Sequence, residues 1–134
     1  MAQREPLSHL AFGQASTGMS NELNDLRDAL RVFAAERDWD QFHSPKNLAS
    51  ALTVEAAELL ERFQWLTEEQ SKNLSSQDKA KVADELADVL IYLVRLADKL
   101  DVELLAAARD KIEHNAEKYP IEKARGNAKK YTDL

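Results

Sequence analysis

The chain has no cysteine among its 134 residues and only three glycines, and each scarcity excludes a class of chemistry. Without cysteine there is no disulfide framework, no thiolate nucleophile and no cysteine-based zinc site. None of the glycines lies between residues 19 and 125, which excludes a glycine-rich phosphate loop of the Walker or dinucleotide type. A bound phosphate would therefore have to be held by metal ions and side chains.

The chain also lacks a long apolar run and an excess of positive charge. No segment approaches the length of a membrane span and the amino terminus lacks a signal-peptide pattern, so we expect a cytoplasmic protein that makes no membrane contact. The net charge of -6 and the absence of a Lys/Arg-rich stripe argue against nucleic acid as a partner. An anionic ligand would have to arrive with its own metal.

The length indicates a single domain, and the hydrophobic period is helical from about residue 21 to about residue 118. Residues 1–20 show no periodicity and are expected to form a flexible lead-in, residues 21–120 an all-α domain and residues 121–134 a polar tail. Strand signals such as period-two alternation are missing. The prediction is a four-helix unit, with residues 39–43 as a loop, residues 67–75 as a connection and Pro120 as the final stop. The expected helices begin at capping residues and run from Ser20 to about Arg37, from Ser44 to about Leu66, from Ser75 or Ser76 to about Leu100, and from Asp101 to about Lys118.

Two acidic pairs at helical spacing, Glu55-Ala-Ala-Glu58 and Glu85-Leu-Ala-Asp88, are the most informative feature of the chain. Residues three apart share a helix face, so each pair directs two carboxylates to the same side. Each pair is therefore half of a site for a hard cation. Because the ligand set contains only oxygen, it favours magnesium, manganese or calcium over zinc.

The first of these helices also places an acid where a solubilising charge is not expected. At 100° per residue Glu55 falls within the apolar arc, and Glu85 borders the arc of the later helix beside Val89. Four carboxylates that converge at a core margin cost several kcal/mol unless cations neutralise them. The alternative is that the pairs are ordinary solvated faces, which arise by chance in a chain with 31% charged residues.

Several aromatic and polar residues are candidates for ligand contact. His43 follows Asp40 at a metal-ligand spacing, but within a predicted loop, which favours a substrate-facing or capping histidine over a ligand. Trp39 and Trp65 flank the first acidic helix, where they could sandwich a planar ring or simply pack at the helix ends.

The last predicted helix carries Lys111, Asn115 and Tyr119 in one row. A cation, an amide and a phenol suit phosphate, base or sugar recognition, and they equally suit a solvated edge. His114 adjoins Glu113 and so misses the E-x-x-H spacing, which disfavours a di-metal oxidoreductase bundle.

The sequence resembles the MazG-like nucleotide pyrophosphohydrolases, and in particular their dCTP pyrophosphatase branch. The resemblance lies in the E-x-x-E pair, a spacer over residues 59–84, the E-x-x-D pair and the tryptophan-flanked segments. It covers most of the chain, from about residue 22, and its strongest stretches are residues 37–47, 55–65, 84–94 and 111–120.

The resemblance implies Mg²⁺-dependent hydrolysis, with Mn²⁺ as a substitute, of a nucleoside triphosphate to the monophosphate and pyrophosphate by a homotetramer. The expected substrate is dCTP or a modified dCTP, as in nucleotide-pool house-cleaning. Glu55, Glu58, Glu85 and Asp88 match the family's metal ligands and catalytic acids. The positions that match its base, sugar and phosphate contacts are Trp39, His43, Lys46, Trp65, Lys111, Asn115 and Tyr119.

Three positions depart from the family pattern. Leu30 stands where close animal relatives have histidine, Ala57 replaces a glycine, and Lys46 replaces an arginine and so loses the bidentate fork. We expect Mg²⁺ held by the four carboxylates to bridge the triphosphate and to activate water for attack at the α-phosphorus, with Glu55 or Glu58 orienting the water. The rival hypothesis is a catalytically degenerate helical module that binds nucleotide or serves oligomerisation.

Overall fold

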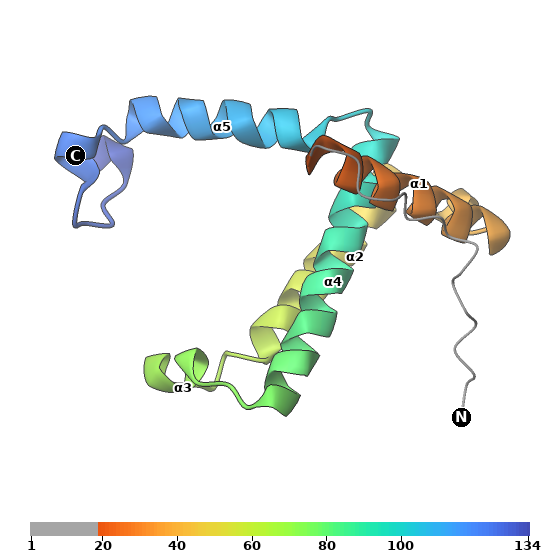
Figure 1. Cartoon of the computed structure of the whole chain (residues 1–134), viewed down its shortest axis with the longest axis horizontal. Coiled ribbons are helices and arrows are strands. Elements are labelled where there is room, and N and C mark those ends of the chain that lie inside the picture. Colours follow the sequence, from red (N-terminus) through yellow and green to blue (C-terminus); the bar gives the residue numbers. More distant parts are fainter. Residues whose placement is uncertain (1–18) are drawn as a thin grey trace. The chain divides into compact units, whose positions relative to one another are not determined.

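The computed structural model describes residues 19–134, with side chains from Glu22 onward, and all the regular structure in that range is helical (Figure 1). This confirms the all-α prediction. The predicted lead-in lies outside the described residues except for its last two positions, which belong to the first helix. The elements are α1 (Met19–Glu36), η2 (Asp40–Phe42), α2 (Pro45–Glu61), α3 (Glu68–Lys72), α4 (Ser76–Lys99), α5 (Leu104–Lys118), α6 (Ile121–Ala124) and η3 (Tyr131–Asp133).

Helix α2 begins where the sequence predicts and ends earlier. Ser44 is its N-cap, with Oγ accepting a hydrogen bond from the backbone N–H of Asn47 at 3.2 Å, and proline occupies the first turn. The predicted end at Leu66 is wrong, because tighter turns replace the helix after Glu61, with the N–H of Phe63 bonded to the carbonyl of Leu60 at 2.9 Å. The sequence pattern extended the helix through Phe63 because this residue is apolar. Its side chain is half-buried, but its backbone lies in the turn.

The cap at Ser44 gives a stability prediction. Replacing Ser44 with alanine leaves the N–H of Asn47 without its acceptor, so we expect the free energy of unfolding to fall by about 1 kcal/mol. Urea titration followed by circular dichroism measures this. The matched control is Ser50→Ala, because the hydroxyl of Ser50 only donates to the carbonyl of Lys46 within the helix. An equal loss in both variants would contradict the capping role.

Of the two later N-caps predicted from the sequence, one is present in the structure and the other is not. Ser75 caps α4 through the N–H of Asp78, as expected. The prediction that Asp101 caps the next helix is wrong. Asp101 adopts a φ of 52° just beyond the end of α4, and α5 begins only at Leu104. An aspartate tolerates this left-handed conformation, so the residue that reads as an N-cap instead follows the end of the preceding helix.

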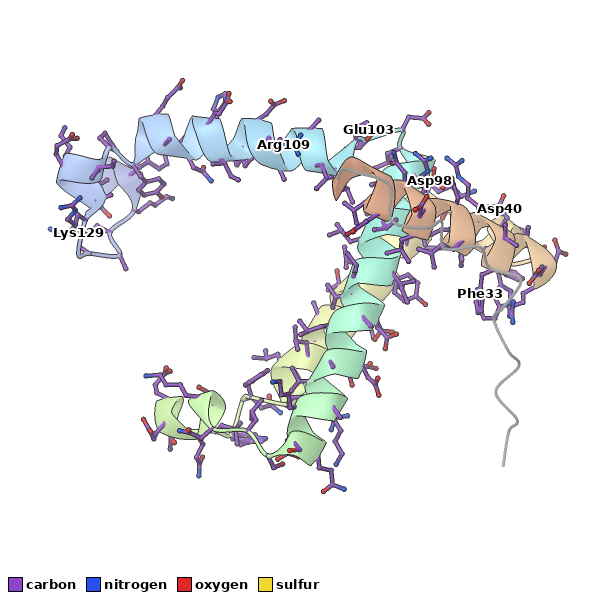
Figure 2. The ribbon with its side chains drawn as sticks, in the orientation of Figure 1. Phe33, Asp40, Asp98, Glu103, Arg109 and Lys129 are labelled. Atoms are coloured by element: carbon purple, nitrogen blue, oxygen red, sulfur yellow. The ribbon has the colours of Figure 1, made fainter. Side chains whose placement is uncertain are left out.

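Helices α2 and α4 pack side by side in opposite directions (Figure 1). Arg62, just after α2, bonds Glu85 in the first half of α4, and His43, just before α2, bonds Arg95 near the end of α4. Helix α1 contacts the same end of α4, where Arg31 forms a bidentate ion pair with Asp98 at 2.8 and 2.5 Å. Figure 2 labels Asp98 on α4.

The described residues divide into two compact units, one ending at Asp101 and the other comprising Val102–Leu134. Helices α1, α2 and α4 therefore share the first unit, whereas α5, the fourth predicted helix, belongs to the second. The predicted domain boundaries stay a prediction. No helix of the described chain is both long enough and apolar enough to cross a bilayer. The buried apolar side chains are mostly small and consist of Ala29, Ala34, Leu48, Val82, Val94 and Ala97.

Candidate metal centre and nucleotide pocket

The antiparallel pairing of α2 and α4 brings the two acidic pairs together. One carboxylate oxygen from each of Glu55, Glu58 and Glu85 lies within 4.8 Å of the others. Asp88 follows one turn after Glu85 and is half-buried, and its charge acts on Glu55. The spacing of the acids within each helix was visible in the sequence, and the packing of the two helices supplies their convergence.

Two of these carboxylates are only partly satisfied by hydrogen bonds. Arg62 donates from Nη2 to Oε1 of Glu85 at 3.3 Å, whereas Oε2 of Glu85 and Oε2 of Glu55 are buried and make no hydrogen bond with any described residue. Buried acceptors normally have partners, because an unmet one costs desolvation free energy. The two oxygens are therefore the groups that a bound cation would satisfy.

The same crowding alters the acidity of Glu55. The pKa of its carboxyl is raised from 4.5 to about 7, first by burial, then by the adjacent Glu58 carboxyl, and then by the charges of Asp88 and Glu85. Like charges in a partly desolvated place disfavour ionisation in this way. A divalent cation would reverse the effect, since it stabilises the ionised form.

A cavity of about 240 Å³ lies in the same unit between α1, the η2 turn and α4. Its α1 wall is apolar and includes Leu30, the position where the relatives were expected to have histidine. Trp39 and His43 line it, as the sequence suggested for a ring-binding site. The complete lining is Leu26, Ala29, Leu30, Phe33, Ala34, Trp39, His43, Ile91, Tyr92 and Arg95.

The cavity and the carboxylates are connected along one helix. Glu85, Asp88, Tyr92 and Arg95 are spaced three, four and three apart, so they follow one face of α4. Tyr92 is four residues beyond Asp88, an axial rise of about 6 Å. The cavity lining therefore begins about one helical turn beyond Asp88.

Comparisons with known proteins identify the family of the chain. A family model described as the MazG-like family matches residues 51–134. The chain is 44% identical over 129 residues to the dCTP pyrophosphatase 1 of Bos taurus, spanning 95% of this chain and 76% of that protein. It is 44% identical over 126 residues to the Homo sapiens dCTP pyrophosphatase 1, spanning 92% of this chain and 74% of that one. The chain belongs to the MazG-like family.

A solved structure shares the fold of this MazG-like protein. The crystal structure of a pyrophosphatase from Archaeoglobus fulgidus superimposes with a TM-score of 0.71 at 38% identity, over 81% of this chain and 99% of that one. The expected resemblance is therefore confirmed at the level of family and fold.

Trp65 lies away from the cavity of this MazG-like protein. It follows α2, whereas Trp39 precedes it, and the 17 residues of α2 span about 25 Å. The two rings therefore cannot sandwich one base within a single chain. Trp65 is 86% exposed. Lys46 is also exposed, in the first turn of α2.

The other predicted ligand contacts belong to the second unit. Lys111 and Asn115 are exposed on α5, and Tyr119 is its C-cap, with its N–H bonded to the carbonyl of Asn115 at 2.8 Å. The ring of Tyr119 packs edge-on against Tyr131, with centroids 6.0 Å apart. Lys111 and Asn115 therefore share a face of α5, whereas Tyr119 lies just beyond the end of this helix.

Sequence reasoning missed two polar residues of the cavity, Tyr92 and Arg95. The available signal was their spacing from Asp88, which continues the acidic face of α4 into an apolar run. An arginine within such a run is a candidate for a buried polar contact, because a buried charge must be paired.

Proposed function

We propose that this protein hydrolyses dCTP or a modified dCTP to the monophosphate and pyrophosphate, with Mg²⁺ as its cofactor. The chain is a nucleotide pyrophosphohydrolase of the MazG-like family, as its similarity to proteins named dCTP pyrophosphatase 1 supports. The observation that carries the proposal is the cluster of Glu55, Glu58 and Glu85 with two unpartnered buried oxygens beside a ring-sized cavity.

The carboxylate cluster fits a hard divalent cation. Its donors are all oxygens, and the unpartnered Oε2 atoms of Glu55 and Glu85 lack any protein donor among the described residues. We assign Glu55, Glu58, Glu85 and Asp88 as the ligands of Mg²⁺, with Mn²⁺ as a substitute. When bound, such an ion supplies charge neutralisation for a polyphosphate and lowers the pKa of a coordinated water.

The protein's own residues then have distinct roles. Glu55 or Glu58 orients and deprotonates the attacking water, because both carboxylates lie within the cluster. Trp39 and His43 hold the base in the cavity. Lys46 approaches the phosphates from the first turn of α2, and Lys111, Asn115 and Tyr119 are proposed as further substrate contacts on the resemblance alone.

We propose further that the chain works as a homo-oligomer, with the tetramer expected from the resemblance. Leu86, Leu90 and Leu93 form an exposed apolar row on α4, and Val54 and Leu60 are exposed on α2. Apolar surface of this extent favours association. In such an assembly Trp65 would contact a substrate bound to another copy.

A substrate panel tests the proposed function. The common deoxynucleoside triphosphates and 5-methyl-dCTP are incubated with the protein, with and without Mg²⁺, and released pyrophosphate is measured after conversion to phosphate. We expect pyrophosphate and monophosphate from dCTP or its modified form only when metal is present. Nucleotide binding without product would instead favour the rival hypothesis of a degenerate binding module.

The role of Trp39 gives a second kinetic prediction. Replacing Trp39 with alanine removes an aromatic wall of the cavity, so we expect KM for dCTP to rise about tenfold, since base stacking contributes about 1–3 kcal/mol. Phe42, which is 59% exposed and absent from the cavity lining, provides the control Phe42→Ala. Steady-state kinetics measures KM for dCTP in both variants, and we expect it to rise only in Trp39→Ala. A similar KM in both would contradict a role for Trp39 in base binding.

A further inference from the structure

Arg95 has an unusual position in this protein. Only 5% of its surface is exposed, and no other charged residue in the described part of the chain is buried. Arg95 also lies in the wall of the cavity. Burying a guanidinium is costly unless every side of it is paired. Its partners therefore indicate what it does.

The guanidinium is held at three points. Nε donates to Nδ1 of His43 at 3.1 Å, Nη2 donates to Oδ1 of Asp40 at 2.6 Å, and Nη1 lies 3.5 Å from Oδ2 of Asp98. Both carboxylates are themselves fixed, Asp98 by the bidentate pair with Arg31 and Asp40 by Lys99. The orientation of Arg95 is thus determined by α1, α4 and the η2 turn together.

The bond to His43 constrains where that imidazole carries its proton. A guanidinium has no acceptor and does not deprotonate in proteins, so Nδ1 of His43 must be the acceptor and cannot carry a hydrogen. In a neutral ring the proton then resides on Nε2. This nitrogen makes no hydrogen bond with any described residue, and His43 lines the cavity.

We propose that Arg95 is a positioning residue that holds His43 as the neutral Nε2–H tautomer, so that the cavity recognises a hydrogen-bond acceptor on the base. The inference rests on the proposed function, because it takes the cavity as the base site. Cytosine presents adjacent acceptors at O2 and N3, whereas uracil and thymine carry a hydrogen on N3. A fixed donor at Nε2 therefore suits either acceptor of cytosine, and at N3 it would reject uracil and thymine, whose N3–H is itself a donor.

The charges around His43 support a ring that stays neutral. Burial lowers its pKa below 6.5, and the positive charges of Arg95 and Lys99 lower it further against the opposing effect of Asp40. The α1 side of the cavity contributes only Leu26, Ala29, Leu30, Phe33 and Ala34, none of which titrates. Protonation of Nδ1 would also place an N–H against the N–H of Arg95.

Nitrogen NMR of the metal-free, ligand-free full chain tests the tautomer directly. The chain has three histidines, and His43→Gln assigns the signal. We expect Nδ1 of His43 to be unprotonated and Nε2 protonated at pH 7 to 8, and the ring to take up its second proton only below pH 6.5. In Arg95→Met we expect the pKa of His43 to rise above its wild-type value, because one of the charges that lower it is gone, whereas Arg95→Gln, which keeps an N–H donor, preserves the wild-type tautomer. A wild-type signal with a proton on Nδ1, or a pKa at or above 6.5, overturns the proposal even if Arg95→Met does not fold.

Kinetics tests the consequence for the base. We expect KM for dCTP to rise about tenfold in Arg95→Met at pH 6, the value of about one hydrogen bond, with kcat little changed. The base-free deoxyribose triphosphate should show no such change, and Arg95→Gln should restore KM. Equal losses with and without a base would mean that Arg95 is only structural. Absence of pyrophosphate release from every substrate would refute the proposed function and leave the NMR result standing.

Discussion

Glu58→Gln and Asp88→Asn are each expected to lower pyrophosphate release by about 100- to 1,000-fold while the helical content stays that of the wild type. Each substitution replaces a carboxylate of the proposed cation site with an isosteric amide. Glu58 shares the cluster with Glu55 and Glu85, and the charge of Asp88 acts on Glu55. An amide offers a neutral oxygen, so the ion is held more weakly and the polyphosphate loses its charge partner.

The stability of these variants separates a chemical role from a structural one. Removing one negative charge from the crowded cluster relieves repulsion, so metal-free Glu58→Gln should melt no lower than the wild type. Its thermal stabilisation by Mg²⁺ should disappear. The control Asp78→Asn makes the same kind of change on an exposed carboxylate at the start of α4 and should leave the rate nearly unaltered. Unchanged pyrophosphate release in Glu58→Gln and in Asp88→Asn would refute the assignment of the site.

Local sequence signals predicted much of this fold because helix periodicity and caps depend on near neighbours. Ser44-Pro45 and Ser75 mark the starts of α2 and α4 correctly. The two errors in helix bounds occurred where a residue typical of a helix interior or of an N-cap lies in a turn instead. Phe63 kept the apolar period through a turn, and Asp101 followed the end of one helix rather than starting the next.

The site was predictable to the extent that it depends on spacing within a helix. The pairs Glu55–Glu58 and Glu85–Asp88 could be found from their separation of three residues. The contact between Arg95 and His43 joins residues 52 positions apart, and it depends on how α4 lies against the η2 turn. Helical periodicity relates residues three or four positions apart, so it cannot predict a contact between residues so far apart in the sequence. Trp65 shows the opposite case, because its neighbours in sequence suggested a ring contact that the length of α2 prevents within one chain.

Cation binding is expected to depend steeply on pH below neutrality. Glu55 has a pKa of about 7 in the metal-free protein, against 4.5 ordinarily, so a cation must displace its proton below pH 7. One displaced proton weakens binding about tenfold per pH unit, which makes the Kd for Mg²⁺ roughly 30-fold higher at pH 5.5 than on the plateau above neutrality. Calorimetry in two buffers of different ionisation enthalpy measures both the affinity and the proton release.

The same shift determines how stability changes without metal. Between pH 4.5 and 7 the folded protein holds the Glu55 proton and the unfolded chain does not, so the free energy of unfolding falls as the pH rises through this window and then levels off. Added Mg²⁺ should therefore raise the melting temperature more at pH 8 than at pH 5.5. Chelation with EDTA at pH 8 should remove this rise together with the pyrophosphatase activity. Asp78→Asn should retain the pH-dependent response, whereas Glu55→Gln should lose it, because the group that exchanges the proton is gone. An Mg²⁺ affinity equal at the two pH values would show that Glu55 is not a ligand.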